Sequence, residues 1–266
     1  MNTSIKLAIT DIIESFKKIR LVHVLAWNDI KQRYRRTILG PIWISLSTLV
    51  TIIGLGLLFG VILNQKTDDY LAYLAVGILF WNFNASVIQE GGNSIIEMER
   101  MVKQFALPYS LCMMRVMYRN ILILIHNLII AFLIFYMFDK ININFNWQSV
   151  FQIILGMAVL GCIVNFSAII STRYRDIQPI SQSVMQLFFY LTPIIWKPEQ
   201  IAESKIILTI LTYNPFYYIL QALRSIIEGV LMPELQIMVL LSMLGAGIII
   251  NTIMLAVSYK KIAFWI

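Results

Sequence analysis

The sequence predicts an all-α integral membrane protein with six transmembrane helices, an N-terminal interfacial amphipathic helix and a re-entrant helical hairpin between spans 5 and 6. Three observations support this prediction. Hydrophobic residues fill 59% of the 266 positions and charged residues only 13%, about half the share in a typical soluble domain. The mean hydropathy is +0.77, and a soluble protein of this size could not bury so much apolar surface. Long apolar runs also recur along the chain.

The composition excludes several other classes of protein. The chain has only two cysteines, Cys112 and Cys162, which are too few for a disulfide scaffold. Its share of apolar residues is too high for a disordered protein. Its formal charge of +7 is found in nucleic-acid-binding proteins. In a membrane protein, such a charge more often reflects Lys and Arg retained on the cytoplasmic side.

The first predicted element is an amphipathic helix over residues 4–20. Its apolar residues recur at three- and four-residue spacing, while Glu14 and several lysines occupy other faces. The apolar positions are Ile5, Ile9, Ile12, Ile13, Phe16 and Ile19. We expect this helix to lie along the cytoplasmic interface with its apolar side in the lipid.

Six apolar runs follow, each of a length that suits a membrane span of about 20 residues. They are residues 38–63, 70–88, 120–138, 150–171, 179–196 and 235–257. None contains Asp, Glu, Lys or Arg, and Pro193 ends the fifth. His126 lies at depth beside Asn127, a pattern typical of an interhelical hydrogen bond rather than of a proton relay.

The distribution of basic residues predicts the orientation. Sixteen of the 21 Lys and Arg residues lie before span 1, between spans 2 and 3, between spans 4 and 5, and after span 6. The acidic residues divide evenly between the two sides, so the asymmetry belongs to the cations. The positive-inside rule therefore predicts that both termini are cytoplasmic.

The cytoplasmic loop of residues 89–119 mixes charged and apolar side chains. Gly91-Gly92 is expected to break the chain before it, and Pro108 after it, leaving room for a short helix. Such a helix would dock onto a soluble partner, and the alternative is a solvated connector.

Residues 197–234 are divided by prolines into two apolar helical pieces, 199–212 and 216–231. Each piece is too short to cross the bilayer. The break at Asn214-Pro215 predicts a hairpin that re-enters the membrane from the outer face over a transport pathway, with a plain interfacial hairpin as the alternative.

The sequence carries no recognisable catalytic motif. It has no G-x-x-x-x-G-K-[ST] phosphate loop and no Cys/His cluster with metal-ligand spacing. With His23 and His126 as the only histidines, a Ser-His-Asp arrangement is not expected. The chain is therefore interpreted as a passive conduit whose energy comes from elsewhere, without a catalytic site, a metal or a cofactor of its own.

Three blocks of residues carry a family resemblance. Residues 27–43 resemble the pattern D-x-x-x-R-Y-R-x-[ST]-x-L-G-x-x-W. Residues 173–177 (RYRDI) and 191–196 (LTPIIW) resemble a second block, and Asn214-Pro215-Phe216-Tyr217-Tyr218, followed by Arg224, resembles a third. Together they resemble the permease subunits of bacterial type-2 ABC polysaccharide exporters, which move O-antigen, capsule and teichoic acid chains.

The resemblance implies a single ABC-2 type transmembrane domain over residues 1–266, located in the inner membrane. It implies a permease homodimer with two cytoplasmic subunits that bind ATP and Mg, and a channel for a lipid-linked polysaccharide, O-antigen first among them, in lipopolysaccharide biosynthesis. Aromatic side chains suit contact with the apolar faces of sugar rings. The channel residues implied in this way are Trp43, Phe59, Phe188, Phe189 and Tyr190.

Three further sets of residues receive roles from the resemblance. Cations at the cytoplasmic mouth could engage the diphosphate of the lipid-linked polymer, and simple positive-inside anchoring is the alternative. The mouth residues are Arg33, Tyr34, Arg35 and Arg36. The ATPase-coupling residues are Ile96, Glu97, Glu99, Arg100 and Lys103. The periplasmic gate would consist of Asn214, Pro215, Phe216, Tyr217 and Tyr218.

Other functions remain as alternatives at this point. An ABC-2 permease for a small drug or lipid has the same number of spans, and a polymer assay separates the two. A membrane-embedded glycosyl- or acyltransferase predicts that changes at Asp29, Asp176 or His126 abolish synthesis rather than export. A proton-coupled flippase predicts dependence on His126 and indifference to the ATPase.

Overall fold

The computed structural model describes residues 2–38, 40, 42–137, 146–201, 204–229 and 231–266. Leu39 and Pro41 of the first block, and the parts of the predicted third span and hairpin at 138, 202–203 and 230, lie outside the described residues. Throughout the described ranges the regular structure is helical, which confirms the predicted all-α class.

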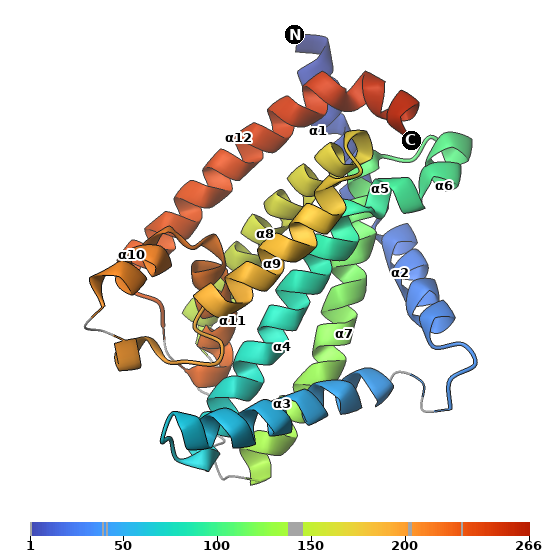
Figure 1. Cartoon of the computed structure of the whole chain (residues 1–266). Coiled ribbons are helices and arrows are strands. Elements are labelled where there is room, and N and C mark those ends of the chain that lie inside the picture. Colours follow the sequence, from blue (N-terminus) through green and yellow to red (C-terminus); the bar gives the residue numbers. More distant parts are fainter. Residues whose placement is uncertain (1, 39, 41, 138–145, 202–203, 230) are drawn as a thin grey trace.

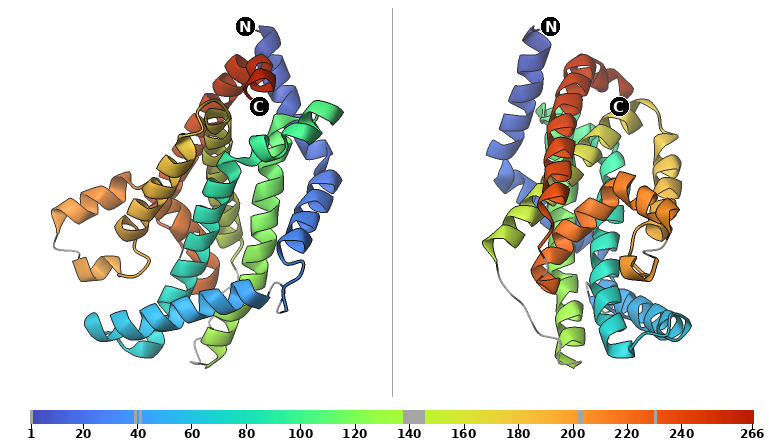
Figure 2. Two further views of the ribbon diagram at one scale, coloured as in Figure 1. Left: turned by 45° about the vertical axis from the view of Figure 1, so that its right-hand side comes forward. Right: turned by 90° about the vertical axis from the view of Figure 1, so that its left-hand side faces the viewer.

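Among the described residues, five helices are long and apolar enough to cross a membrane, so the chain is a multi-pass membrane protein. They are α3 (Ile42–Ile62), α4 (Thr67–Gly92), α7 (Tyr109–Met137), α8 (Trp147–Arg173) and α12 (Glu234–Trp265). Helix α4 lies at the centre, in contact with α3, α7 and α8 and with two shorter helices, α9 (Ile177–Leu191) and α11 (Pro215–Glu228) (Figure 1). Helix α3 lies across the ends of α4 and α7 in Figure 1 and in the left-hand view of Figure 2.

The predicted break at Gly91-Gly92 agrees with the structure, because α4 ends at Gly92 and Asn93 caps it. A Cβ atom on Gly91 would collide with a methyl group of Val164 on α8, so the glycine permits close packing of the two helices. Helix α7 likewise begins at Tyr109. The predicted loop 89–119 therefore shrinks to 93–108, and the second and third spans gain the charged residues that the prediction had placed outside them.

The predicted fifth span, 179–196, is a shorter helix, α9 (Ile177–Leu191). Its 15 residues extend about 22 Å, less than the roughly 30 Å of a hydrocarbon core. Thr192 precedes Pro193 and adopts an extended conformation with φ −97° and ψ 140°. A residue before proline is pushed out of the helical region, so the helix ends before the predicted boundary at Trp196.

The segment after α9 contains a 3-10 turn, η1 (Pro198–Ile201), and two helices, α10 (Lys205–Tyr213) and α11 (Pro215–Glu228). The two helices meet at Asn214 with a bend of 79°. Proline stands at the first position of α11, where its missing N–H costs no hydrogen bond. This pair suits either a broken span or a re-entrant loop, so re-entry from the outer face stays a prediction.

The N-terminal region forms two helices, α1 (Asn2–Lys17) and α2 (Ile19–Arg33), where the prediction had one over residues 4–20. Helix α1 packs against α7 and α12. Ala8, Asp11 and Ser15 are buried in this contact, whereas Ile13 and Phe16 are 49% and 63% exposed. The apolar side therefore points away from the protein, an arrangement that suits contact with lipid.

Candidate functional site

The described residues form two polar clusters at separate places on the helices. We call the first the charge cluster; it comprises Asp29, Arg33, Glu90, Arg115, Arg119 and Asn120. The second, the hairpin cluster, comprises Tyr70, Tyr73, Thr192, Asn214 and Arg224.

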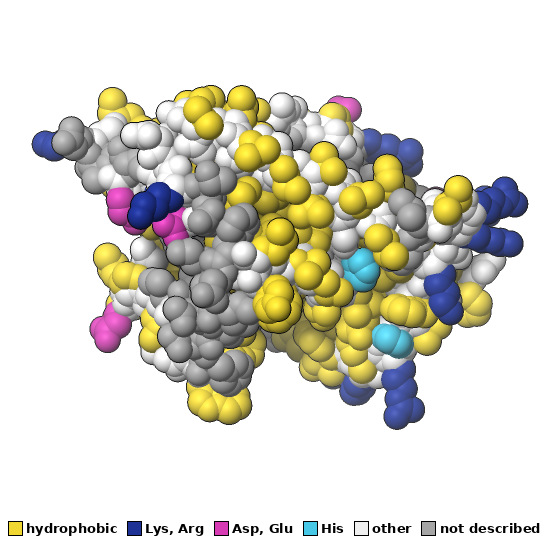
Figure 3. Space-filling view, turned by 90° about the horizontal axis from the view of Figure 1, so that it is seen from below, with side chains coloured by type: hydrophobic (Ala, Val, Ile, Leu, Met, Phe, Trp, Pro, Cys, Tyr) yellow, Lys and Arg dark blue, Asp and Glu magenta, His cyan; other side chains and the backbone are white. Residues whose placement is uncertain are grey.

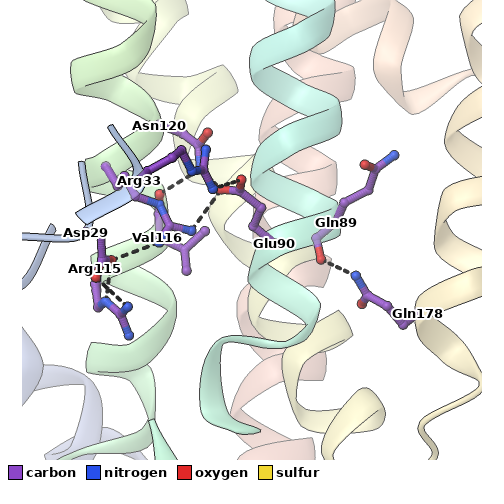
Figure 4. Close-up of polar contacts among 9 residues, drawn as sticks. Asp29, Arg33, Gln89, Glu90, Arg115, Val116, Asn120 and Gln178 are labelled. Atoms are coloured by element: carbon purple, nitrogen blue, oxygen red, sulfur yellow. Dashed lines mark hydrogen bonds and ion pairs between the residues drawn. The ribbon is translucent and has the colours of Figure 1, made fainter. Parts of the chain in front are cut away.

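The charge cluster ties α2 to α4 and α7 (Figure 4). Arg115 binds Asp29 through two hydrogen bonds of 2.6 Å. Arg119 bridges the two carboxylates: its Nη1 is 2.8 Å from Asp29 Oδ2 and its Nη2 is 2.8 Å from Glu90 Oε2. Such charge-assisted pairs are stronger than neutral hydrogen bonds, and they hold α2 beside the two spans.

Glu90 accepts two further hydrogen bonds within the charge cluster. Asn120 Nδ2 donates to Oε2 at 2.8 Å, and Arg33 Nη2 donates to Oε1 at 2.6 Å. The Arg33 side chain is 43% exposed, whereas that of Arg119 is 7% exposed. Burial opposes the charge of Arg33, but the attraction of Glu90 outweighs it and raises the pKa of the guanidinium. Arg33 is therefore the accessible cation of the cluster.

The four residues predicted at the cytoplasmic mouth separate into two groups. Arg33 is bound to Glu90, whereas Arg35 and Arg36 are exposed and Tyr34 is half-buried. Arg36 has a φ of +74° in the turn after α2. Seen from the α3 side, hydrophobic side chains cover the middle of the molecule and Lys and Arg gather at the edge where α2 lies (Figure 3).

The predicted coupling residues lie on two short helices, α5 (Ser94–Glu97) and α6 (Glu99–Phe105), rather than on one. The inner side of this segment is buried and consists of Ile95, Met98 and Val102. The predicted residues lie on its outer side or next to the break, and all are half-buried or exposed. They are Ile96 and Glu97 on α5, and Glu99, Arg100 and Lys103 on α6.

Asn214 is the central residue of the hairpin cluster and is 1% exposed. Its Oδ1 accepts the N–H groups of Phe216 at 3.0 Å and Tyr217 at 3.4 Å, which caps α11. Its Nδ2 donates to Thr192 Oγ1 at 2.9 Å. One side chain thus joins the end of α9 to the bend between α10 and α11. The predicted gate residue Pro215 begins α11 at this same bend.

Two tyrosines of α4 hold the segment that follows α9. Tyr70 donates its hydroxyl to the carbonyl of Ile195 at 2.8 Å, and Tyr73 donates to those of Pro193 and Trp196 at 2.8 and 3.0 Å. Since these carbonyls lie beyond the helix, they have no intrahelical partners, and the tyrosines satisfy them.

Arg224 of α11 is buried, and its guanidinium carbon lies 4.1 Å from the centre of the Tyr73 ring. Gly77 of α4 leaves room for it. A Cβ atom on Gly77 would collide with Arg224 Nη2 and would lie 3.1 Å from the carbonyl oxygen of Ile194. The glycine is therefore required by the close approach of three segments.

Gly77→Ala is expected to lower the free energy of unfolding by about 2 kcal/mol, because the added methyl group overpacks this site. Gly54→Ala is the matched control, since nothing lies within 4 Å of its Cβ position on α3; it should be neutral or stabilise by up to about 1 kcal/mol. Thermal unfolding of the purified protein in detergent measures both. Equal effects of the two substitutions would contradict the close packing around Arg224.

The predicted channel residues do not form a single group. Trp43 and Tyr190 are 57% and 62% exposed, and Phe59 packs against the core from α3. Phe188 and Phe189 pack against Phe216 and Trp81 respectively, with ring centres 4.9 and 5.9 Å apart. Phe216 thereby connects the predicted gate with the predicted channel. Of the other two gate residues, Tyr218 donates to the carbonyl of Thr212 at 2.9 Å and Tyr217 stacks edge-on against Tyr218.

A further contact connects α1 with the start of α7. The buried carboxylate of Asp11 accepts the N–H groups of Tyr109 at 2.8 Å and Ser110 at 2.9 Å. Burial raises the pKa of Asp11, although these hydrogen bonds favour the charged form. The contact caps α7, whose first N–H groups would otherwise lack partners.

The sequence argument missed most of the charge cluster and the stacking of Arg224 on Tyr73. A signal for the former was present, because Asp29 and Arg33, and likewise Arg115 and Arg119, are four residues apart and share a helical face. In the described ranges, no group of His, Cys, Asp and Glu has the geometry of a metal site.

Comparison with known proteins gives consistent results. A family model described as ABC-2 type transporter matches residues 20–227. An O-antigen export system permease protein RfbA from Myxococcus xanthus is 20% identical over 218 residues, covering 80% of this chain and 82% of the relative. Two such proteins from Klebsiella pneumoniae are 26% and 23% identical, covering 79% and 77% of this chain and 82% and 79% of the relatives.

Proposed function

We propose, since the chain belongs to the ABC-2 type transporter membrane family, that it is the channel-forming permease subunit of an exporter of lipid-linked polysaccharide, with O-antigen as the first candidate. The observation that carries this proposal is the similarity, over about four-fifths of the chain, to relatives named as O-antigen export permeases. Membership of the family implies a membrane subunit that works with an ATP-binding partner.

The proposed assembly is a permease homodimer with two ATP-hydrolysing subunits in the bacterial inner membrane, with both termini cytoplasmic. The α5–α6 segment would sit on the ATPase, because its inner side is buried by apolar residues and its outer side carries Glu97 and Arg100. Exposed Arg35 and Arg36, with Arg33 beside them, would meet the diphosphate of the incoming lipid carrier. The bend at Asn214 would form the outer gate.

The geometry gives little support to a transferase. Asp29 is bound by two arginines, and Asp176 is exposed just before α9. His126 Nδ1 is 2.8 Å from Ser45 Oγ, an interhelical contact of the kind expected from the sequence. These three side chains lie on separate elements, and Asp29 already serves as an ion-pair partner.

The decisive experiment is deletion of the gene, with complementation, in a strain whose surface polysaccharide and intracellular lipid-linked polysaccharide are measured separately. Deletion is expected to remove the surface polymer and to accumulate lipid-linked polymer inside, because synthesis continues without export. Complementation by the wild-type chain should reverse both changes, and a partner ATPase without its phosphate-loop lysine should reproduce the deletion.

Three outcomes would contradict the proposal. Unchanged surface polymer after deletion would favour a small drug or lipid as the substrate. Loss of polymer both outside and inside, reproduced by changes at Asp176 or His126, would favour a transferase. A requirement for His126 without any requirement for the ATPase would favour a proton-coupled flippase.

A further inference from the structure

An open groove with a volume of about 360 Å³ lies between helices α4 and α9. Trp81 and Gln89 line it from α4, and Gln182, Gln186 and Phe189 line it from α9. Figure 4 shows the Gln89 side chain on the side of α4 that faces α9. We call this site the glutamine groove; it combines amide groups with aromatic rings and contains no charged side chain among the residues that line it.

The spacing of the glutamines fixes them on one face of α9. Gln178, Gln182 and Gln186 are four residues apart, so they lie one above the other on the helix. Gln178 Nε2 donates to the carbonyl of Gln89 at 2.5 Å and fastens the end of this row to α4. Gln182 and Gln186 are exposed, with their amide groups available to another molecule.

Lipid is an unsuitable neighbour for this face. Helix α9 runs beside α4, which is one of the candidate spans (Figure 1). Hydrocarbon offers no hydrogen-bond partners, and a primary amide that faces it loses the partners that water would provide. Two exposed amides in a row at this position therefore indicate a polar occupant.

The chemistry of the groove matches an uncharged sugar. Each glutamine amide has two N–H donors and a carbonyl acceptor, and a hydroxyl group both donates and accepts. Phe189 is half-buried and presents aromatic surface to the same groove, and the buried Trp81 ring supports it with a ring centre 5.9 Å away. An aromatic face packs well against an apolar surface such as the C–H face of a sugar ring. An acidic sugar would need a cation, and the residues that line the groove include none.

We propose that the glutamine groove is a sugar-binding site on the transport path and that it is selective for neutral, hydroxyl-rich units of the polymer. This inference rests on the proposed export function. It assigns substrate contact to Gln182 and Gln186, which the sequence argument did not select, and to Phe189, whose ring is supported from behind by the buried ring of Trp81.

The first test replaces both exposed amides by a side chain of similar size, Gln182→Leu with Gln186→Leu. The ratio of surface to intracellular polymer is expected to fall about fivefold for each amide removed, because each supplies one hydrogen bond to the sugar. Gln236→Leu, at the start of α12 outside the groove, is the matched control and should export like the wild type. Protein levels should stay unchanged in all variants.

The outcomes separate the groove from the function on which it rests. If the wild-type chain itself does not restore surface polymer to the deletion strain, the proposed function fails and the groove with it. If the wild type exports and the double variant exports equally well, the groove alone is overturned.

A second test measures what Gln186 faces. Gln186→Cys, in a Cys112→Ala, Cys162→Ala background, is expected to react with a membrane-impermeant maleimide, and Leu187→Cys beside it is expected to remain unlabelled. Labelling should fall at least fivefold in cells that make the polymer relative to cells that do not. Equal labelling in the two kinds of cell, or a disulfide between the introduced thiols of neighbouring protomers without protection by polymer, would overturn the proposal.

Discussion

Glu90→Ala is expected to destabilise the protein far more than the loss of a carboxylate from an exposed ion pair. Glu90 accepts hydrogen bonds from Arg33, Arg119 and Asn120. Its removal takes away the carboxylate that binds Arg33 and leaves Asp29, which pairs with Arg115 and Arg119, as the remaining carboxylate of the charge cluster. Loss of one partner of a buried ion pair leaves an uncompensated charge, so the free energy of unfolding should fall by about 4 kcal/mol.

Glu99→Ala is the matched control for Glu90→Ala. Glu99 forms an ion pair of 2.8 Å with Lys103, but both side chains are more than 40% exposed. Exposed pairs of this kind contribute little, so this variant should unfold like the wild type. Thermal unfolding in detergent, followed by size-exclusion chromatography, measures both.

Glu90→Gln tests whether the charge or the shape of the side chain matters. It retains the size of Glu90 and one acceptor oxygen, so its stability should lie between those of the wild type and Glu90→Ala. A double-mutant cycle with Arg119→Met should give less than additive losses, since the two side chains are in contact. Equal unfolding temperatures for Glu90→Ala and Glu99→Ala would show that the charge cluster does not hold α2 in place.

The fold class follows from the sequence because hydropathy is a property of long segments. An apolar run of 20 residues has few stable structures in lipid other than a helix, and α3, α8 and α12 begin within a few residues of their predicted starts. The prediction of a bend at Asn214-Pro215 also agrees with the structure, since the fixed φ of proline and its missing N–H act locally.

The errors arise where packing with another segment decides the conformation. Gly91 lies in the last turn of α4 and permits close contact with Val164 on α8, and the sequence of one segment does not reveal that contact. Glu90 and Arg119 were predicted to lie in a loop, because charged residues usually lie outside the membrane. Their mutual neutralisation, through a bridge to α2, is a three-dimensional property that no single segment displays.

Asn214→Ala should lower the free energy of unfolding by about 3 kcal/mol, combining the loss of a helix cap with buried polar groups left without partners. The N–H groups of Phe216 and Tyr217 and the hydroxyl of Thr192 would all lose the bond to this side chain. Thermal unfolding of the purified variant in detergent checks the size of the loss. Because these bonds join α9 to the bend, limited proteolysis of this variant should cut between α9 and α11 sooner than in the wild type.

The chain provides a matched control at Asn146, whose side chain caps α8 by accepting the N–H of Gln148 at 3.0 Å. Asn146 is exposed, so water replaces the lost bond, and Asn146→Ala should cost about 1 kcal/mol or less. Asn214→Ser retains an acceptor for the cap but is too short to reach Thr192, and should therefore recover only part of the loss. Thr192→Val combined with Asn214→Ala should cost less than the sum of the single variants. Additive losses in that pair would mean that Asn214 acts only as a cap, and that the end of α9 is held to the bend by the tyrosines of α4 alone.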